Sequence, residues 1–364
     1  MRTDVPLYRW LTPFAWLYGG IIALRNRLFD WGILPSVRFP LPVICIGNLA
    51  VGGTGKTPHV EYLIRLLSDR YRVAVLSRGY KRRTKGFRLA DAHDTSETIG
   101  DEPFQLKTKF PQLLVAVSED RRMGIRRLGE LPEEQRPQLL LLDDAYQHRY
   151  VTPSFSILLT DSHRLYTRDA LLPVGRLREP ATGAKRADVV VVTKCEPLPT
   201  ERDRAVIREE LALREGQALC FSEIRYGDLY PLFPEEALPR ILASLTAEEV
   251  LLWTGIAHPE PLERLLRQHA KRLTAMAFPD HHAFTEVDVR RIDAVYQQLP
   301  SPKLMVVTEK DAARLRTCSL IPSSWRTSLY YLPITVGFSA ADEQLFNRLI
   351  ESHIESFSNE RKAE

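Results

Sequence analysis

The chain of 364 residues has few cysteines, and they lie far apart. Cys45, Cys195, Cys220 and Cys318 form no C-x-x-C pair, and no histidine stands at metal-ligand spacing from them. This pattern excludes a disulfide framework and argues against structural zinc. We therefore predict four reduced, partly buried thiols in a cytosolic protein.

The sequence also lacks an apolar run long enough to cross a membrane as a helix. The uncharged run between Arg9 and Arg25 is interrupted by Pro13 and Gly19-Gly20, and a spanning helix needs about 20 apolar residues. No small-residue cleavage site follows, which argues against a signal peptide. Because this region is rich in tryptophan and has arginines beside the aromatic residues, we predict that residues 1–35 form an amphipathic helix in a membrane interface. A helix packed on the protein's own core is the alternative.

A strong charge of either sign is absent as well. The net charge is +4, hydrophobic residues make up 44% and charged residues 26%, as in a soluble globular protein. A mildly basic chain suits an anionic partner without implying nucleic acid, so we expect no nucleic-acid partner. No obligate protein partner is evident from the sequence either. Proline and charge increase between Glu196 and Ala247, which predicts a domain at 36–200 and a smaller α/β domain at 201–364.

The most informative stretch runs from Gly47 to Pro58 and follows the apolar run Val43–Ile46. A buried strand, a glycine-rich turn and a helical pattern are the context of a phosphate-binding P-loop. Ala50 occupies the first glycine position of that motif, and a dinucleotide-binding reading fails because its third glycine would fall on Pro58. The predicted nucleotide-binding residues are Gly52, Gly53, Thr54, Gly55, Lys56 and Thr57.

The residues of this loop have different expected tasks. The glycines let backbone N–H groups converge on an anion at a helix N-terminus. Lys56 would reach the β- and γ-phosphates, and the Thr57 hydroxyl would ligate Mg²⁺. We therefore predict a P-loop NTPase-type, mostly parallel sheet flanked by helices, with ATP and Mg²⁺ as cofactors.

Acidic residues follow other predicted strands and helices. Asp143 and Asp144 end the apolar run Leu139–Leu142, as in a Walker B segment, and such carboxylates bind Mg²⁺ or its waters. Asp101 opens a helical pattern after Gly100 and is either a helix cap or a general base. Arg178 and Glu179 either clamp a phosphate and a metal ion or form a surface ion pair.

Two further motifs carry candidate residues. Five basic residues between positions 78 and 85 form either a solvated loop or a site for anionic groups. Asp280 and His281 form either an ordinary turn or a proton-accepting pair, which a kinase needs for the acceptor hydroxyl.

The order of the motifs resembles that of the tetraacyldisaccharide 4'-kinases of lipid A biosynthesis, from the N-terminal helix to at least Asp311. Ala145-Tyr146 departs from that pattern, since the family usually has Gly-Phe there. The motifs that carry the resemblance are Gly-Asn-x-x-Val-Gly-Gly-Thr-Gly-Lys-Thr, Ser-Arg-Gly-Tyr, Gly-Asp-Glu-Pro, Ser-Glu-Asp-Arg, Asp-Asp-x-x-Gln-His, Arg-Glu-Pro, Pro-Asp-His and Thr-x-Lys-Asp.

The resemblance implies ATP-dependent phosphorylation of the 4'-hydroxyl of tetraacyldisaccharide 1-phosphate to give lipid IVA, by a peripheral enzyme on the cytoplasmic face of the inner membrane. It also implies roles for named residues. Asp101 would be the catalytic base, coupled to His281 and supported by Asp280, with Arg178 near the transferred phosphate. Glu179, Asp143 and Asp144 would hold the metal ion or its waters.

Two other classes share the P-loop. A regulatory GTPase or metallochaperone would need guanine selectivity, and the sequence lacks a clear Asn-Lys-x-Asp motif. A membrane-recruited scaffold ATPase would assemble into dimers or filaments and make no phosphorylated product.

Overall fold

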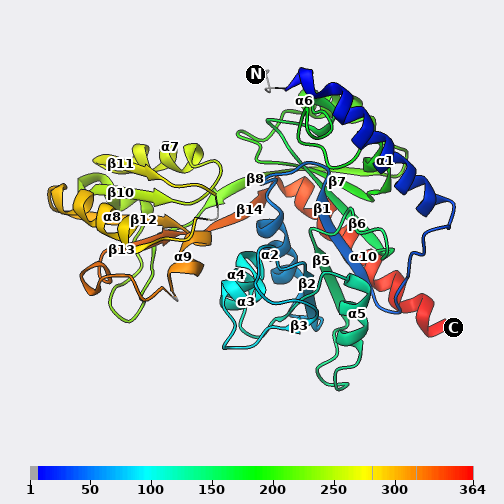
Figure 1. The fold of residues 1–364 in the computed structure, drawn as a ribbon, viewed down its shortest axis with the longest axis horizontal. Coiled ribbons are helices and arrows are strands. Elements are labelled where there is room, and N and C mark those ends of the chain that lie inside the picture. Colours follow the sequence, from blue (N-terminus) through cyan, green and yellow to red (C-terminus); the bar gives the residue numbers. More distant parts are fainter. Residues whose placement is uncertain (1–6, 281, 317, 364) are drawn as a thin grey trace. The chain divides into compact units, whose positions relative to one another are not determined.

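The computed structural model describes residues 7–280, 282–316 and 318–363. The chain forms two compact units. Unit 1 runs to Ile224 and resumes at Val336, and unit 2 is Arg225–Thr335. Figure 1 shows the chain leaving the first unit through one strand and returning through another.

Unit 1 is built around a sheet of nine strands among the described residues, in the order β14-β8-β7-β6-β1-β5-β2-β4-β3. From β4 to β8 all neighbours pair in parallel, and β3 is antiparallel to β4. The strands are β1 (Val43–Asn48), β2 (Val73–Ser77), β3 (Arg88–Leu89), β4 (Leu114–Val117), β5 (Leu139–Asp143), β6 (Phe155–Asp161), β7 (Val189–Thr193), β8 (Ala218–Tyr226) and β14 (Ile334–Phe338).

Helices cover both faces of this sheet, and every residue of β1, β2, β5 and β7 is buried. Strands covered on both faces have continuous apolar runs instead of alternation, which explains the runs in the sequence. The helices and 3₁₀ turns are η1 (Arg9–Leu11), α1 (Thr12–Asp30), α2 (Lys56–Leu67), α3 (Ser96–Ile99), α4 (Asp101–Lys109), α5 (Arg121–Gly129), η2 (Tyr166–Arg168), η3 (Ala181–Arg186), α6 (Glu201–Glu210) and α10 (Ala340–Ala363).

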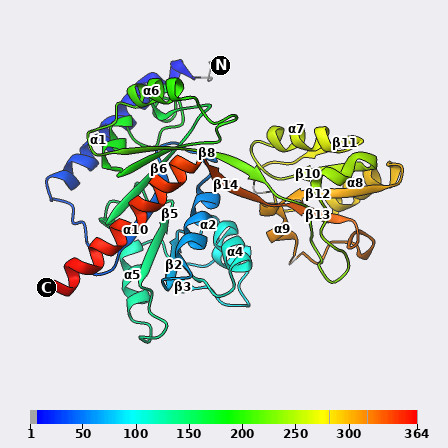
Figure 2. The same cartoon turned by 180° about the vertical axis from the view of Figure 1, so that it is seen from behind.

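The C-terminal helix α10 belongs to unit 1 although it follows unit 2 in the chain (Figure 2). Phe346 on α10 is buried against Tyr62 of α2, and Asp342 forms a salt bridge of 2.6 Å with Arg204 of α6. The division therefore differs from the predicted boundary at residue 200, because β8, β14 and α10 complete the first sheet and its cover.

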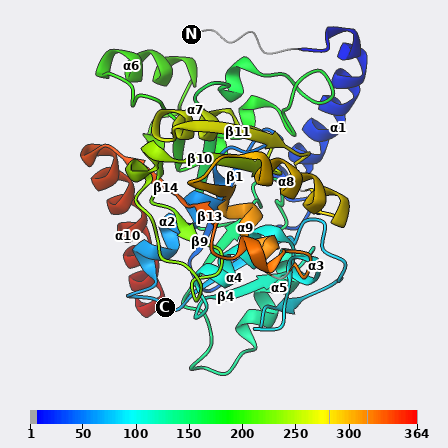
Figure 3. The same cartoon turned by 90° about the vertical axis from the view of Figure 1, so that its left-hand side faces the viewer.

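Unit 2 has its own five-stranded sheet among the described residues, in the order β11-β10-β12-β13-β9 (Figure 3). Alternate residues of β12 face opposite ways. Met305 and Val307 pack with α8 and α9, whereas Leu304 and Val306 pack with α7. The elements are β9 (Tyr230–Pro231), η4 (Leu242–Ala247), β10 (Glu249–Thr254), α7 (Glu260–His269), β11 (Arg272–Ala277), α8 (Glu286–Gln298), β12 (Lys303–Thr308), α9 (Glu309–Leu315), η5 (Ser323–Trp325) and β13 (Leu329–Leu332).

Helix α1 presents two different faces. Ala15 and Phe29 are buried against the rest of unit 1, whereas an apolar stripe with a spacing of three, four or seven residues is exposed. The members of this stripe are Trp10 of η1, Phe14, Leu17, Ile21 and Leu24 of α1, and Trp31, which directly follows α1, each more than half exposed. No helix in the described part of the chain has the length and hydropathy of a membrane span. The four cysteines are free, as predicted.

Candidate functional site

The predicted phosphate loop connects β1 to α2 and is fixed by contacts with other loops. Gly52 and Gly55 have φ angles of 111° and 85°, which favour glycine. The Val51 N–H donates to Arg176 O over 2.8 Å, and the Thr193 hydroxyl donates to Thr54 O over 2.9 Å. Because Gly55 is the N-cap of α2, the loop ends at the helix N-terminus, where an anion is favoured.

Four side chains meet beside this loop, and we call them the phosphate-loop cluster: Asn48, Lys56, Asp144 and Arg178. The Lys56 ammonium lies 3.6 Å from an Asp144 carboxylate oxygen and 3.4 Å from Asn48 Oδ1. The Arg178 guanidinium lies 3.2–3.3 Å from both Asp144 oxygens. These contacts are longer than the 2.7–2.9 Å of strong charge-assisted hydrogen bonds, so the cations are only loosely held.

Asp143 and Asp144 differ in their ionisation although they are adjacent. Asp143 is 2% exposed, and burial, with the nearby charges of Glu102 and Asp144, raises its pKa to about 7. Burial acts on the pKa of Asp144 in the same direction, but the charges of Lys56 and Arg178 outweigh it and hold that pKa below its usual value. Asp144 is therefore an anion at neutral pH, whereas Asp143 titrates there.

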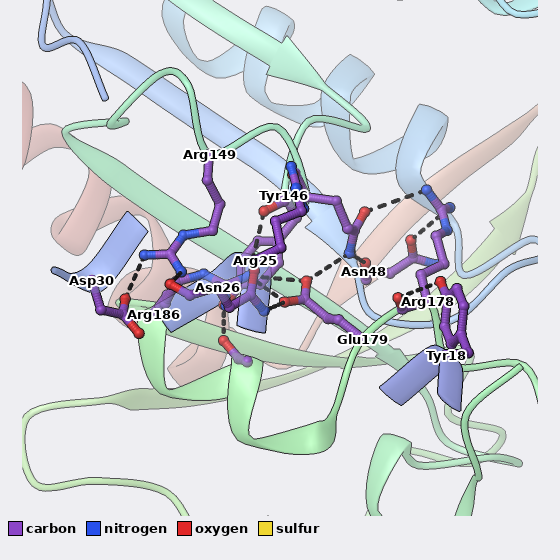
Figure 4. Close-up of polar contacts among 12 residues, drawn as sticks. Tyr18, Arg25, Asn26, Asp30, Asn48, Tyr146, Arg149, Arg178, Glu179 and Arg186 are labelled. Atoms are coloured by element: carbon purple, nitrogen blue, oxygen red, sulfur yellow. Dashed lines mark hydrogen bonds and ion pairs between the residues drawn. The ribbon is translucent and has the colours of Figure 1, made fainter. Parts of the chain in front are cut away.

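Glu179 is the centre of a second group, which we call the Glu179 cluster: Asn26, Gln147, Glu179 and Arg186. Figure 4 labels Asn26, Glu179 and Arg186. Its carboxylate is 2% exposed and accepts from Arg186 at 2.9 Å on both oxygens. Gln147 donates to it over 2.9 Å and Asn26 of α1 over 3.3 Å. Arg178 and Glu179 thus do not form a pair with each other; each belongs to a different cluster.

The Gly100-Asp101 turn lies against the basic loop that follows β2. A Cβ atom on Gly100 would lie 3.1 Å from Gly79 Cα, and one on Gly79 would lie 2.8 Å from Ile99 O. Only glycine allows this backbone approach. Asp101 is the first residue of α4, and the charge of the next residue, Glu102, acts on the pKa of Asp143. The start of α4 therefore lies near the Walker B acids.

The remaining predicted residues belong to unit 2. Asp280 lies in the loop after β11 and pairs with Lys310 of α9 at 3.2 Å. His281 lies outside the described residues. The neighbouring His282 contacts Asp288 at 2.9 Å, and Arg314 donates to His282 O over 2.8 Å. Asp101 and Asp280 thus belong to different units, and their coupling stays a prediction.

Two observations bear on a magnesium ion. Asp143 Oδ1 is buried without a hydrogen-bond partner, and a metal ion or its water would satisfy such an atom. Among the described residues no three His, Cys, Asp or Glu side chains are grouped to hold a metal. Mg²⁺ in proteins is bound through one or two carboxylates, waters and substrate phosphates. Both Glu179 oxygens already accept hydrogen bonds from Arg186, so its metal role stays a prediction.

Asn48 is a site residue that the sequence prediction does not include. Its side chain is fully buried and contacts both cations of the phosphate-loop cluster. The available signal was a polar residue at the end of an otherwise apolar strand, directly before the glycine-rich turn. Gln147 stands in the motif Asp-Asp-x-x-Gln-His without a predicted task, yet it donates to Asn48 O over 2.8 Å and to Glu179.

Comparison with known proteins gives consistent matches over almost the whole chain. Residues 7–355 match the family model described as LpxK, tetraacyldisaccharide-1-P 4'-kinase. A tetraacyldisaccharide 4'-kinase of Parabacteroides distasonis is 55% identical over 98% of both chains, and one of Bacteroides fragilis is 49% identical over 97% of this chain and 95% of its own. The crystal structure of LpxK from Aquifex aeolicus in complex with ATP is similar with a TM-score of 0.71 and 30% identity, over 94% of this chain and 98% of that one.

Proposed function

Because the chain belongs to the family of tetraacyldisaccharide-1-P 4'-kinases, we propose that it transfers the γ-phosphoryl group of ATP to the 4'-hydroxyl of tetraacyldisaccharide 1-phosphate, which gives lipid IVA. The observation that carries this proposal is the phosphate-loop cluster at the N-terminus of α2, where Lys56 and Arg178 are held loosely beside Asp144. ATP as the donor is supported by the solved relative, which was crystallised with ATP.

The loop and its neighbours supply the phosphate contacts. The backbone N–H groups of Gly52–Thr57 bind the phosphates, and Lys56 moves from Asp144 and Asn48 to the β- and γ-phosphates. Arg178 offsets the negative charge on the transferred group. Since transfer passes through a state with charge spread over the phosphoryl oxygens, catalysis here is mostly positioning and electrostatic stabilisation.

Thr57, Asp143 and Asp144 are the residues we propose for the Mg²⁺ ion or its waters. When bound, Mg²⁺ neutralises charge on the phosphates and orients them. Support comes from the buried Asp143 oxygen that has no partner and from the ionised Asp144 beside it. Glu179 is the fourth predicted ligand. Its hydrogen bonds to Arg186 favour instead a task in fixing Gln147 and α1.

Asp101 is the proposed general base. A sugar hydroxyl is a poor nucleophile, and a positioned base contributes about 10²–10⁴ in rate. In the reaction the 4'-oxygen forms a bond to the γ-phosphorus, the bond from that phosphorus to the β,γ-bridging oxygen breaks, and the hydroxyl proton passes to Asp101. His281 is proposed to be coupled to Asp101 in this step, with Asp280 in support, as the family resemblance implies.

The exposed stripe of α1 is proposed to bind the membrane that holds the lipid. A substrate with four acyl chains stays in the bilayer at about 0.8 kcal/mol per buried CH₂. The stripe presents Trp10, Phe14 and Trp31 to solvent, while the opposite face is fixed to unit 1 by Asn26. This arrangement fits a peripheral protein, and the cytoplasmic face of the inner membrane is where we place it.

The experiment is product analysis. Purified protein is incubated with Mg²⁺ATP and detergent-dispersed tetraacyldisaccharide 1-phosphate, and mass spectrometry is used to detect the addition of one phosphate to the lipid. We expect this product with the native protein and its loss in Lys56→Ala. Folded, ATP-binding protein that makes no product in several lipid dispersions would favour the switch or scaffold classes, and a preference for GTP would favour the switch.

A further inference from the structure

The first turn of α2 contains a histidine that no step of the proposed reaction uses. His59 is 1% exposed, and its Nδ1 atom lies 2.7 Å from the carbonyl oxygen of Gly55. The same oxygen also accepts the helical bond from the His59 N–H, but over 3.3 Å. Since hydrogen bonds weaken as they lengthen, the imidazole ring is the stronger of the two donors to this carbonyl.

The two ring nitrogens of His59 have different tasks. A carbonyl oxygen only accepts, so Nδ1 carries the proton. Burial lowers the pKa of His59 to about 4, so the ring is neutral at physiological pH and Nε2 has no proton. The buried Ser222 hydroxyl, 3.1 Å from Nε2, therefore donates to it. The hydrogen bonds run in one direction from Ser222 through His59 to Gly55. The Gly55 carbonyl selects the tautomer, because a carbonyl oxygen only accepts whereas the Ser222 hydroxyl can donate or accept.

The position of Gly55 explains why this bond matters. Gly55 is the N-cap of α2 with a φ angle of 85°. Its C=O and the N–H of Lys56 are opposite ends of one planar peptide group. A bond that holds the carbonyl oxygen on the His59 side therefore directs the Lys56 N–H away from it, toward the place where a phosphate binds at a helix N-terminus.

We propose that His59 is a positioning residue that orients the Gly55–Lys56 peptide for phosphate binding, with Ser222 holding the Nε2 side of the ring in place. This inference rests on the proposed ATP site and adds a residue outside the loop to it. Ser222 lies on β8, the strand that leads out of unit 1, and the His59 ring also packs edge-on against Phe338 of β14, the strand that returns. Through His59, the phosphate loop is thus in contact with both connecting strands.

The test is MgATP binding without lipid, measured by isothermal titration calorimetry. His59→Leu keeps the bulk but removes the donor, and we expect about tenfold weaker binding, as one lost hydrogen bond implies. His59→Asn places an amide N–H near the position of Nδ1, and we expect binding within about threefold of the native value. Tyr62→Phe, on the same helix and in the same aromatic group, is the matched control and should bind normally.

Steady-state kinetics gives a second readout, since the KM for ATP should rise in His59→Leu while the KM for the lipid stays unchanged. Native affinity in His59→Leu, or an equal loss in His59→Leu and His59→Asn, would overturn the proposal, because the donor would then not matter. If thermal unfolding shows that His59→Leu is not folded, the variant Ser222→Ala decides. At least twofold weaker ATP binding in Ser222→Ala supports the hydrogen-bonded series from Ser222 through His59 to Gly55, and unchanged binding rejects it.

Failure of the proposed function is distinguishable from failure of this inference. If the native protein binds MgATP but makes no lipid product, the proposed substrate is wrong, and the His59 comparison still stands on binding alone. If the native protein does not bind MgATP, the ATP site itself is wrong.

Discussion

Arg178 and Glu179 are adjacent in the sequence, but they lie in clusters with opposite properties. In the phosphate-loop cluster the contacts of Arg178 and Lys56 are 3.2–3.6 Å long, and the Asp144 side chain is 34% exposed. In the Glu179 cluster three of the contacts are 2.9 Å long, and the carboxylate is buried. Loosely held cations can change partner when an anion binds, whereas a buried carboxylate with several short bonds resists change. The first cluster is therefore suited to chemistry, and the second to holding α1 and Gln147 in place.

The largest expected effect is on the first cluster. Lys56→Ala removes the ammonium group that we assign to the phosphates, and we expect kcat/KM to fall by about 10²–10³. The midpoint of thermal unfolding should change little, because the lost contacts are long. The matched control is Lys185→Ala, an exposed lysine on η3. Native turnover in Lys56→Ala would contradict the catalytic role of the phosphate-loop cluster.

A substitution in the Glu179 cluster should lower the stability of the protein. Glu179→Ala leaves Arg186, Gln147 and Asn26 without their common acceptor, and breaking a buried ion pair costs about 3–5 kcal/mol of unfolding free energy. Urea denaturation measures this. Glu130→Ala is the control, since its pair with Arg127 is exposed and contributes at most about 1 kcal/mol. A Glu179→Ala protein of native stability with a higher Mg²⁺ requirement would instead make Glu179 a metal ligand.

The pH dependence of Asp143 sharpens the comparison further. Its pKa of about 7 in the folded protein lies above that of an unfolded aspartate, so the folded state binds the proton more tightly. The Asp143 contribution to stability is therefore fully present below about pH 4 and is lost as the pH rises through 7. Asp143→Asn removes this titration. We therefore expect the unfolding free energy of the variant minus that of the native protein to increase by on the order of 1–3 kcal/mol from pH 5 to pH 8 without Mg²⁺.

Urea denaturation of both proteins at each pH checks this prediction, because their difference cancels the other titrating groups. A difference that does not vary with pH would show that Asp143 is ionised throughout. Added Mg²⁺ should reduce the difference at pH 8, since the ion compensates the buried charge.

The smallest expected effect concerns the contact between α1 and the loop that carries Arg178. The Tyr18 hydroxyl donates to Arg178 O over 2.7 Å. Tyr18→Phe should lower the unfolding free energy by about 0.5–1.5 kcal/mol and leave turnover close to native. Tyr8→Phe is the control, since Tyr8 is 59% exposed. A large loss of turnover would mean that α1 positions Arg178 directly.

Local features of the site were predictable from the sequence. The apolar run before Gly47 and the glycines after it predicted β1, the loop and α2, because strand, turn and helix signals there are all local. The run Leu139–Leu142 likewise placed Asp143 at the end of β5. The fold class and the family followed from such motifs, and the comparisons confirm both.

Contacts between distant segments were not predictable in the same way. The bond from Asn26 to Glu179 joins residues 153 positions apart, and no local pattern encodes it. The return of β14 and α10 to the first sheet depends on which edge strand is left unpaired, so the predicted boundary at residue 200 differs from the division in the structure. For the close approach of Gly79 to Gly100, the only signal in the sequence is two isolated glycines.

The most direct test compares two adjacent residues in one assay. Single-turnover transfer from Mg²⁺ATP to tetraacyldisaccharide 1-phosphate is measured for Arg178→Ala and Glu179→Gln, with each rate expressed per folded protein. We expect a fall of about 10² or more for Arg178→Ala and a rate within about threefold of native for Glu179→Gln, whose amide keeps the size of the side chain. Equal losses in both variants, or a larger loss in Glu179→Gln, would contradict this expectation.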